Sequence, residues 1–275
     1  MPQRSVLITG CSSGIGLAAA QTMRDRDWRV FATARAPGDL ARLKHEVGVE
    51  SLYLDYTEPD SIAAAADHVL TATGGTLTAL FNNGAYGQAG AIEDLPTEAL
   101  RAQFETNVFG WHDLTRRLIA PMRAQGHGRI VQCSSVLGLV AAPYRGAYCA
   151  SKFAIEALTD TLRMELKGTG IHVTLIEPGP IATRFVETAI KYYKRHIDME
   201  NSPHRDVYRV RLAKMEDGGQ MAFKLEPEAV CGKLVHALES RWPKTRYYVT
   251  VPTYTGAFLR RVLPARALDF IAAKN

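Results

Sequence analysis

Short apolar segments rich in β-branched residues alternate with longer helical segments along almost the entire chain. Several of the apolar segments have hardly any polar residue, which is typical of a parallel sheet covered by helices on both faces. The alternation predicts an α/β fold, a Rossmann-type doubly wound parallel sheet of about seven strands in a single domain spanning 1–275. Right-handed crossovers would then place the ligand crevice at the carboxyl ends of the strands. The predicted strands are 5–10, 28–35, 51–56, 79–84, 129–135, 172–179 and 246–251, and the predicted helices are 14–26, 58–72, 97–123, 148–167 and 226–240.

Composition is typical of a soluble globular protein and argues against several other classes. Of the 275 residues, 47% are hydrophobic and 22% charged, and no stretch approaches the roughly 18 uncharged apolar residues of a membrane span. The N-terminal segment MPQRSVLITG enters an apolar strand directly, so we expect no signal peptide. The cysteines form no CxxC pair and the histidines no HExxH motif, so neither a disulfide framework nor a metal site is indicated. We expect a cytoplasmic enzyme or binding protein.

The net charge of +5 is unevenly distributed along the chain. Residues 183–214 hold eight Lys or Arg against four Asp or Glu, and residues 241–275 hold seven against one. Such asymmetry can indicate nucleic acid or an anionic membrane surface, and it equally suits solvated faces around the site of an anionic cofactor. We favour the cofactor interpretation and expect no nucleic-acid partner, because no nucleic-acid recognition motif is present.

The segment TGCSSGIG, residues 9–16, joins the first predicted strand to the first predicted helix. Gly10, Gly14 and Gly16 would let the backbone turn tightly and approach a pyrophosphate, whose charge the helix N-terminus would stabilise. A glycine-rich loop is a weak signal by itself, and its position between a strand and a helix strengthens it. Its GxxxGxG spacing differs from the usual dinucleotide fingerprint.

Tyr148 and Lys152, in the segment YCASK, are one helical turn apart and share a helix face. Such a pair is common on the surface of an ordinary amphipathic helix. The alternative is a catalytic acid, because a phenol titrates near ~10 in water and a neighbouring positive charge lowers its pKa toward neutrality. Motifs elsewhere in the chain are needed to distinguish the two interpretations.

Four further motifs accompany the glycine loop and the Tyr–Lys pair: NNGA (82–85), TNVFG (106–110), CSSVLG (133–138) and EPGPIAT (177–183). Together the six resemble the classical short-chain dehydrogenase/reductase family, in order and over nearly the whole chain. NNGA differs from the family's Asn-Asn-Ala-Gly by exchange of the last two residues, which affects only local detail. The resemblance implies an oxidoreductase acting on CH–OH groups and favours the catalytic interpretation of Tyr148.

The resemblance implies a role for each catalytic position. Tyr148 would be the general acid in reduction and the base in oxidation, and Lys152 would lower its pKa and hold the nicotinamide ribose. Ser135, thirteen residues before Tyr148, matches the serine that hydrogen-bonds the substrate carbonyl, whereas the adjacent Ser134 would point to the opposite face of the strand. Asn107 would anchor a water that passes protons to Lys152, with a side chain bonded inside its helix as the alternative.

Arg35 ends the second predicted strand, where NAD-binding sheets usually carry an acid for the ribose 2′-hydroxyl. A guanidinium suits a 2′-phosphate, so we expect NADP(H) ahead of NAD(H), with Ser13 as a second phosphate contact and a surface arginine as the alternative. The resemblance implies that Asp55 accepts from the adenine amino group and that Ile181 and Thr183 contact the nicotinamide carboxamide. The motifs add further expected cofactor contacts: Gly10, Ser12, Gly14, Ile15, Gly16, Asn83, Tyr148, Lys152, Pro178 and Gly179.

Residues 183–222 interrupt the alternation of strands and helices after the sixth predicted strand. This insertion would lie directly over the ligand crevice. The segment carries Phe185, Tyr192, Tyr193 and Tyr208 among charged residues. Its last residues, EDGGQ (216–220), predict a flexible connection back to the rest of the domain. Two interpretations stand: a helical substrate lid inserted in the domain, or a solvent-exposed pair of helices.

The segments TGCSSGIG, YCASKFAIEAL and RYYVTVPTY resemble the steroid and retinol dehydrogenase branch and its bacterial NADP-dependent aldehyde and ketone reductases. The likeness implies a small hydrophobic carbonyl or alcohol substrate, such as an aldehyde, a ketone, a retinoid or a steroid. The competing function is a protein that binds NADP(H) as a sensor or scaffold without turnover. A sugar-nucleotide epimerase ranks last, because it would need a different glycine spacing and a longer chain.

The C-terminal segment GAFLRRVLPARALDFIAAKN combines apolar residues with arginines. Phe258, Leu259, Val262 and Leu263 would share one face before Pro264 bends the chain. We expect this face to pack in the core or between the subunits of a homodimer or homotetramer. A weak contact with a membrane surface is the minority interpretation.

Overall fold

The computed structural model describes residues 3–217 and 222–273, and these form a single domain around one parallel sheet. The strands are β1 (Ser5–Ile8), β2 (Arg29–Ala34), β3 (Glu50–Tyr53), β4 (Ala79–Asn82), β5 (Gly128–Cys133), β6 (Ile171–Glu177) and β7 (Arg246–Tyr248). The 7-stranded sheet has the order β3-β2-β1-β4-β5-β6-β7. Because the order reverses between β1 and β4, the sheet is doubly wound, which confirms the predicted fold class and all the predicted strands.

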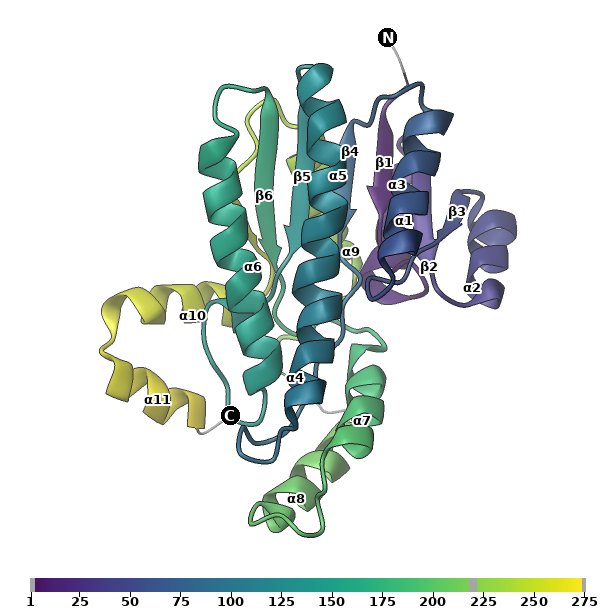
Figure 1. Cartoon of the computed structure of the whole chain (residues 1–275). Coiled ribbons are helices and arrows are strands. Elements are labelled where there is room, and N and C mark those ends of the chain that lie inside the picture. The colour runs from purple at the N-terminus through teal and green to yellow at the C-terminus, as the bar shows by residue number, and fades with distance from the viewer. Residues whose placement is uncertain (1–2, 218–221, 274–275) are drawn as a thin grey trace.

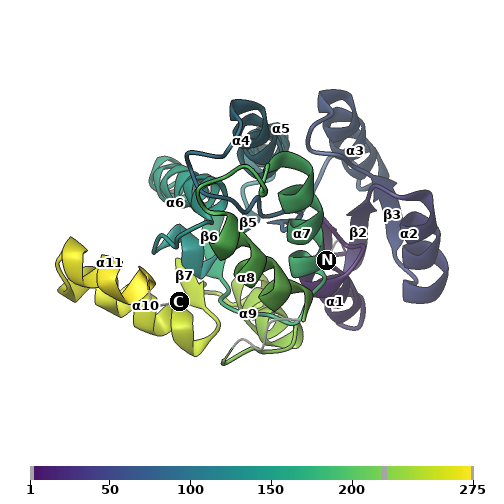
Figure 2. The same cartoon turned by 90° about the horizontal axis from the view of Figure 1, so that it is seen from below.

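Helices cover both faces of the sheet (Figures 1 and 2). They are α1 (Gly14–Arg24), α2 (Pro37–Arg42), α3 (Pro59–Ala72), α4 (Thr97–Phe104), α5 (Gly110–Ala124), α6 (Gly146–Glu165), α7 (Phe185–His196), α8 (Arg205–Glu216), α9 (Glu228–Glu239), α10 (Val251–Val262) and α11 (Ala265–Ala273). Helices α3, α5 and α6 lie on one face, and α1 and α9 lie on the other. Helix α2 packs beside β2 and β3 at the edge of the sheet.

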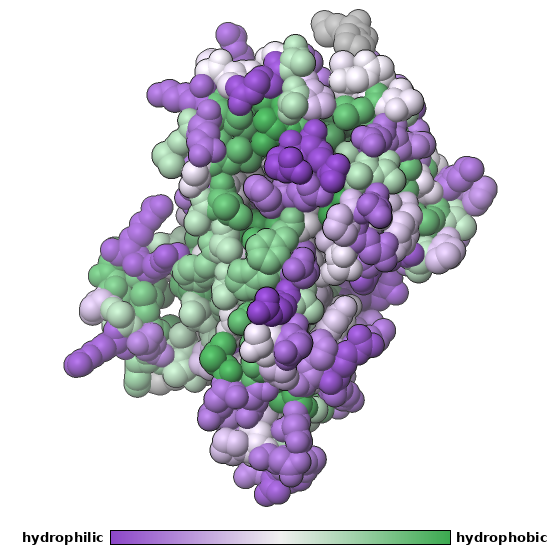
Figure 3. Space-filling view, in the orientation of Figure 1, coloured by the Kyte–Doolittle hydropathy of each residue, from purple (hydrophilic) through white to green (hydrophobic). Residues whose placement is uncertain are grey.

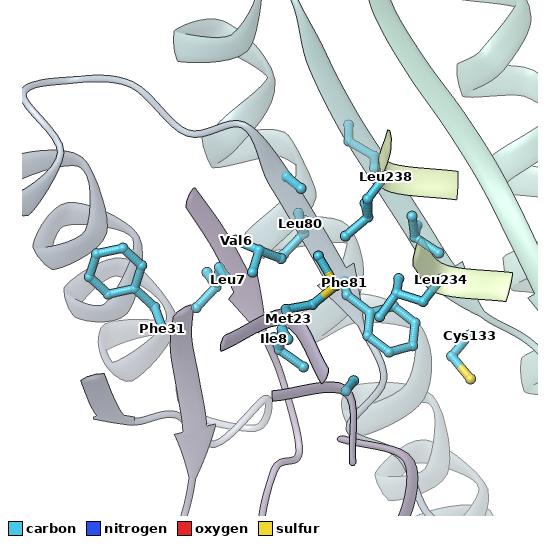
Figure 4. Close-up of a cluster of buried hydrophobic side chains, with 14 of the residues drawn as sticks. Val6, Leu7, Ile8, Met23, Phe31, Leu80, Phe81, Cys133, Leu234 and Leu238 are labelled. Carbon is cyan, nitrogen blue, oxygen red and sulfur yellow. The ribbon is translucent and has the colours of Figure 1, made fainter. Parts of the chain in front are cut away.

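The core lies between the sheet and its helices, and Figure 4 shows part of it around β1 and β4. Val6, Leu7 and Ile8 of β1 have no exposed surface, because helices cover both faces of this inner strand. Met23 of α1 and Leu234 of α9 belong to the same cluster. Burying each such side chain stabilises the fold by about 1.5–3 kcal/mol, which fixes the strand ends that carry the site.

The helix predicted over 97–123 is interrupted in the structure. A π-helical turn, Glu105–Phe109, separates α4 from α5 and contains Asn107. Gly110 begins α5 directly against the side chain of Tyr56, where an added Cβ would lie 2.5 Å from the Tyr56 Cβ. Such π-helical turns often occur at functional sites, since they re-aim side chains within a helix.

The C-terminal region differs from the predicted pattern. The seventh strand ends at Tyr248 instead of continuing to residue 251, and α10 begins at Val251 with Pro252 in its first turn, a position that favours helix initiation. Helices α10 and α11 project from one edge of the domain, where apolar and polar residues are interspersed (Figures 1 and 3). Of the four residues expected to share a face, Phe258 and Val262 are exposed, whereas Leu259 and Leu263 are half-buried.

Helices α7 and α8 form the described part of segment 183–222 and lie below the carboxyl ends of the strands (Figures 1 and 2). They are fixed by a second hydrophobic cluster, in which Tyr193, Ile197 and Tyr208 pack against Ala89 and Ala91. Tyr193 and Tyr208 are completely or almost completely buried, with their rings edge to face at 5.5 Å. The pair is therefore packed onto the domain, and neither is a freely solvated helix. The predicted flexible exit around Gly218 and Gly219 lies outside the described residues.

Candidate active site

A cavity of about 550 Å³ opens at the carboxyl ends of the strands. Its walls come from the loops after β1 to β6, together with α6 and the start of α7. Gly16 and Asn107 lie outside its lining, and the other predicted site residues are in it: Gly10, Ser12, Ser13, Gly14, Ile15, Arg35, Asp55, Asn83, Ser135, Tyr148, Lys152, Pro178, Gly179, Ile181 and Thr183. The structure thus gathers residues up to 173 positions apart in one place, as the strand-end argument requires.

The glycine-rich loop depends on the small size of its residues. Gly10 and Gly14 have φ values of +70° and +55°, a region that side chains rarely adopt. An added Cβ at Gly10 would lie 2.5 Å from the Gly84 Cα, and one at Gly16 would lie 2.3 Å from the Gly10 carbonyl oxygen. Gly84 packs against the loop as well, since an added Cβ there would lie 3.2 Å from the Gly10 backbone nitrogen.

Hydrogen bonds from β4 hold the glycine loop in place. The Thr9 hydroxyl accepts from the backbone amides of Asn83 and Gly84, at 2.9 and 3.1 Å. The Asn83 side-chain amide donates to the Thr9 carbonyl at 3.0 Å. A rigid loop with small residues, at the N-terminus of α1 and facing a large cavity, fits the phosphates of a dinucleotide.

Tyr148, Ser135 and Lys152 converge on the opposite side of the cavity and are all buried. Ser135 follows β5 by two residues, and its hydroxyl accepts from the Leu137 amide at 3.1 Å. Lys152 Nζ donates to the Cys133 carbonyl at 2.8 Å and lies 5.7 Å from the centre of the Tyr148 ring. Ser134 is buried but not bonded to Tyr148, in agreement with the predicted alternation of side chains.

Burial dominates the titration of the Tyr148 phenol. It raises the pKa of Tyr148 above the ordinary value, and the nearby Ser135 hydroxyl and Arg145 guanidinium only partly oppose it. Burial also lowers the pKa of Lys152 to about 8. The expectation that the Tyr–Lys spacing alone lowers the phenol pKa is therefore not met, since the Lys152 ammonium donates to the Cys133 carbonyl.

The Asn107 side chain lies behind the cavity wall. Its Nδ2 donates to the Tyr86 carbonyl at 2.9 Å and to the Ser151 hydroxyl at 3.2 Å, and its Oδ1 accepts from the Tyr86 amide at 3.2 Å. Ser151 immediately precedes Lys152 on α6, so Asn107 connects the loop after β4 to the helix that carries the Tyr–Lys pair.

Arg35 and Asp55 face each other at the far end of the cavity. Arg35 Nη1 donates to Asp55 Oδ2 at 3.2 Å, and Arg35 is 60% exposed. Burial raises the pKa of Asp55, but the Thr57 hydrogen bonds and the Arg35 charge outweigh it and the net pKa is lowered. The guanidinium is thus placed at the end of β2 and still open to a further anionic partner.

A comparison with sequence models of protein families finds a match in the N-terminal two thirds of the chain. The sequence model of the family described as "short chain dehydrogenase" matches residues 4–193. The chain is a short-chain dehydrogenase/reductase. As a member of that family it is an NAD(P)-dependent oxidoreductase of carbonyl and alcohol groups.

Three similar proteins share most of its length. An uncharacterized oxidoreductase, YbbO, of Escherichia coli (strain K12) is 43% identical over 98% of this chain and 94% of its own. The NADPH-dependent 3-dehydrocapnine reductase of Ornithobacterium rhinotracheale is 32% identical over 99% of this chain and 97% of its own. Human 17-beta-hydroxysteroid dehydrogenase type 1 is 32% identical over 91% of this chain and 78% of its own.

A solved structure supports the fold as well as the family. A short-chain dehydrogenase from Streptomyces avermitilis aligns with a TM-score of 0.79 at 28% identity and covers 100% of this chain and 95% of its own. The predicted resemblance to classical members, including the steroid dehydrogenase branch, is confirmed by these relatives.

Among the cavity and loop residues of this dehydrogenase that were not identified from the sequence, four deserve mention. Arg42 and Arg184 both donate to the Ser12 carbonyl, at 2.6 and 3.0 Å, and so brace the glycine loop from two sides. Tyr86 and Arg145 line the cavity. Arg184 and Tyr86 directly follow recognised motifs, so extending those motifs by one residue would have found them, whereas nothing in the sequence distinguishes Arg42 from a surface residue.

The first turn of α7 lines the cavity. The Phe185 ring is 5.3 Å from the Tyr148 ring, and the Tyr192 ring stacks on Tyr86 at 4.0 Å. Thr183 lies so close to Gly14 that an added Cβ there would be 2.7 Å from the threonine Cγ2. Segment 183–222 therefore begins in contact with the glycine loop and continues past the Tyr148 side of the cavity.

The described part of the chain shows neither a metal centre nor a membrane-spanning helix. No group of three His, Cys, Asp or Glu side chains in it is placed to hold a metal ion. None of the helices described is long and apolar enough to cross a membrane.

Proposed function

We propose that this short-chain dehydrogenase/reductase uses NADP(H) to interconvert the carbonyl and alcohol forms of a small hydrophobic substrate. The observation that supports it most is the convergence of Tyr148, Ser135 and Lys152 on the cavity that the glycine loop borders. When bound, the nicotinamide supplies a hydride to the carbonyl carbon or accepts one from the alcohol carbon. The chain's own residues provide the binding, the orientation and the proton.

Each catalytic side chain has a distinct task. The Ser135 hydroxyl orients the substrate carbonyl, and the Tyr148 phenol donates a proton to its oxygen in reduction or removes it in oxidation. Lys152 holds the ribose hydroxyls and contributes positive charge beside the phenol. Asn107 acts as a positioning residue, because its contacts run to Tyr86 and to the helix that carries Lys152.

The proposed cofactor is NADP(H), held by the contacts expected from the motifs. Arg35 directly follows β2 beside the cavity and is exposed enough to pair with a 2′-phosphate while Asp55 orients it. Arg184 lies beside the glycine loop, where it would add a positive charge for the pyrophosphate. The NADPH dependence stated in the name of the Ornithobacterium relative is consistent with this choice.

The proposed substrate is apolar around its reacting carbon. Leu137, Phe185 and Val186 line the cavity near Tyr148. Segment 183–222 serves as the lid that excludes water during hydride transfer, with Phe185 and Tyr192 as its inner surface. We propose further that the protein is a cytoplasmic homodimer or homotetramer in which the exposed side of α10 and α11 packs on a second copy, with a membrane surface as the weaker alternative.

A turnover screen tests the proposal. Purified protein is mixed with NADPH or NADH and with aldehydes, ketones, retinoids and steroids, and cofactor oxidation is followed by absorbance. We expect turnover with at least one class, and a higher kcat/KM with NADPH than with NADH. Tight NADPH binding in isothermal titration, without turnover of any class in either direction, would instead identify a sensor or scaffold. Light scattering after gel filtration measures the oligomer.

A further inference from the structure

Arg145 is a cationic group in the cavity that the family motifs do not account for. It precedes Tyr148 by three residues, at the N-terminus of α6, and lines the cavity. Its backbone is fixed, because it bridges to Gly90 on the neighbouring loop and the Gly90 amide donates to the Tyr144 carbonyl at 3.0 Å. The side chain therefore starts from a rigid position beside the phenol.

The Arg145 guanidinium has no hydrogen-bond or ion-pair partner within residues 3–217 and 222–273. The acidic side chains on the neighbouring loop are bonded elsewhere. Glu93 pairs with His204 at 2.5 Å, and Asp94 accepts from the Ser202 hydroxyl at 2.5 Å and from the Tyr208 phenol. A guanidinium carries five donors and always retains its charge, so a partly buried one without a carboxylate is uncommon.

A second guanidinium lies close to Arg145. Burial lowers the pKa of Arg145 and the charge of Arg211 lowers it further, while the phenol of Tyr148 opposes this shift. Arg211, on α8, lies 4.4 Å above the ring of Tyr144, the residue that precedes Arg145 in the chain. Arg145 lines the cavity, and Arg211 adds positive charge from behind the wall. With no acidic partner for Arg145 among the described residues, this part of the wall stabilises an anion that binds against it.

We infer that the substrate carries an oxyanion, such as a carboxylate, sulfonate or phosphate, which Arg145 binds while the substrate carbonyl lies against Tyr148 and Ser135. This inference rests on the proposed function and narrows its substrate class to keto or hydroxy acids with an apolar chain. Arg145 and Tyr148 line the same cavity and interact electrostatically, so one small substrate can present its oxyanion to Arg145 and its carbonyl to Tyr148. Arg145 then determines specificity, and the apolar chain extends past Phe185.

The test compares an acid with its neutral ester. A medium-chain γ-keto acid, its methyl ester and the matching γ-keto sulfonate are titrated into the NADP⁺-loaded protein, and their turnover with NADPH is measured separately. The variants are Arg145→Gln and Arg145→Lys, with Arg209→Gln as the control. Arg209 is on the same helix as Arg211, is 60% exposed and pairs with Glu200 at 3.1 Å, so its removal changes the net charge equally without touching the cavity.

We expect the wild-type protein to bind the acid or the sulfonate at least tenfold more tightly than the ester. Arg145→Gln should reduce that ratio by roughly ten- to a hundredfold, as expected for a charge-assisted bidentate contact, whereas Arg209→Gln should leave it unchanged. Arg145→Lys should fall between them, because it keeps the charge and loses the planar fork. A response to sulfonate alone or to carboxylate alone supports the inference and identifies which oxyanion is preferred.

Two outcomes overturn the inference. One is a wild-type protein that binds ester and acid equally. The other is an Arg145→Gln protein, folded by circular dichroism, in which acid and ester lose kcat/KM equally; Arg145 would then act on the Tyr148 proton alone. If the acid binds as expected but no compound is turned over, the oxyanion site stands and the proposed catalytic function fails.

Discussion

Glu177→Gln should change the pH dependence of stability in a way that the structure allows us to calculate. Glu177 ends β6 with no exposed surface, and its Oε1 accepts from Arg246 at 2.8 Å. Arg246 also pairs with Glu156 and Asp160, both on α6, so three carboxylates share one guanidinium. Burial, and then the negative charge of Glu156, raise the pKa of Glu177 to about 8, although Arg246 opposes both.

A raised pKa means that the folded protein binds the Glu177 proton more tightly than the unfolded chain does. The stability that results is complete below the ordinary value of 4.5 and is lost as the pH rises toward 8. Each pH unit between these limits costs about 1.4 kcal/mol, so the free energy of unfolding should fall by roughly 2 kcal/mol between pH 5 and pH 7 because of this group. Glutamine cannot ionise and still accepts a hydrogen bond from Arg246. The free energy of unfolding of the variant should therefore not show this decrease between pH 5 and pH 7.

The assay is urea unfolding followed by circular dichroism at pH 5, 6 and 7, for wild type and Glu177→Gln. Staying below pH 8 avoids Lys152, whose lowered pKa of about 8 contributes with the opposite sign at higher pH. Glu200→Gln, which removes a carboxylate that is 71% exposed, is the matched control. The reasoning is refuted if the difference between Glu177→Gln and wild type stays constant across this range, or if Glu200→Gln shows the same pH-dependent gain.

Three other predictions concern the site. Tyr148→Phe removes only the phenol hydroxyl, so it should keep NADPH affinity in isothermal titration and lose most turnover; activity within a few-fold of wild type would remove Tyr148 from the catalytic role. Arg35→Ala should raise the KM for NADPH roughly ten- to a hundredfold, the scale of a charge-assisted contact, with little effect on NADH; equal effects on both cofactors would make Arg35 structural. Hydrogen exchange in 184–215 should slow on adding NADPH and again with substrate; exchange already as slow as in β4 and β5 of the free protein would make this segment a fixed wall.

The centre of the sheet was predictable because its inner strands are mostly apolar runs bounded by turn or helix signals. Burial on both faces leaves these strands without a polar alternation, as in Val6–Ile8 of β1, whereas the edge strands β3 and β7 are only partly buried. Prediction failed where the same local sequence is compatible with two structures, as with the helix predicted over 97–123. The π-helical turn at 105–109 leads into Gly110, which packs against Tyr56 in the loop after β3, a contact between distant segments that the local sequence does not reveal.

The candidate site was predictable to the extent that its residues lie in contiguous motifs at strand ends. Gly10, Ser135 and Tyr148 fall into this class and meet in the cavity. Arg145 does not, because its importance comes from the lack of a carboxylate among the described residues around it, and only the folded arrangement reveals which acids are already paired. The buried cluster around Arg246 could not be predicted from the sequence for the same reason, since its three carboxylate partners come from α6 and β6.

The raised pKa of Tyr148 has a consequence for the two directions of the reaction. A buried phenol keeps its proton at neutral pH, so it is ready to act as an acid, and an oxyanion at Arg145 would neutralise one of the charges that favour the phenolate. The rate of ketone reduction should therefore stay nearly constant from pH 6 to about 7.5, whereas the rate of alcohol oxidation, which needs the base form, should rise steadily with pH. Stopped-flow measurement of hydride transfer in both directions checks this. A reduction rate that already falls between pH 6 and 7 in proportion to a single deprotonation would mean that cofactor and substrate lower the phenol pKa far more than burial raises it.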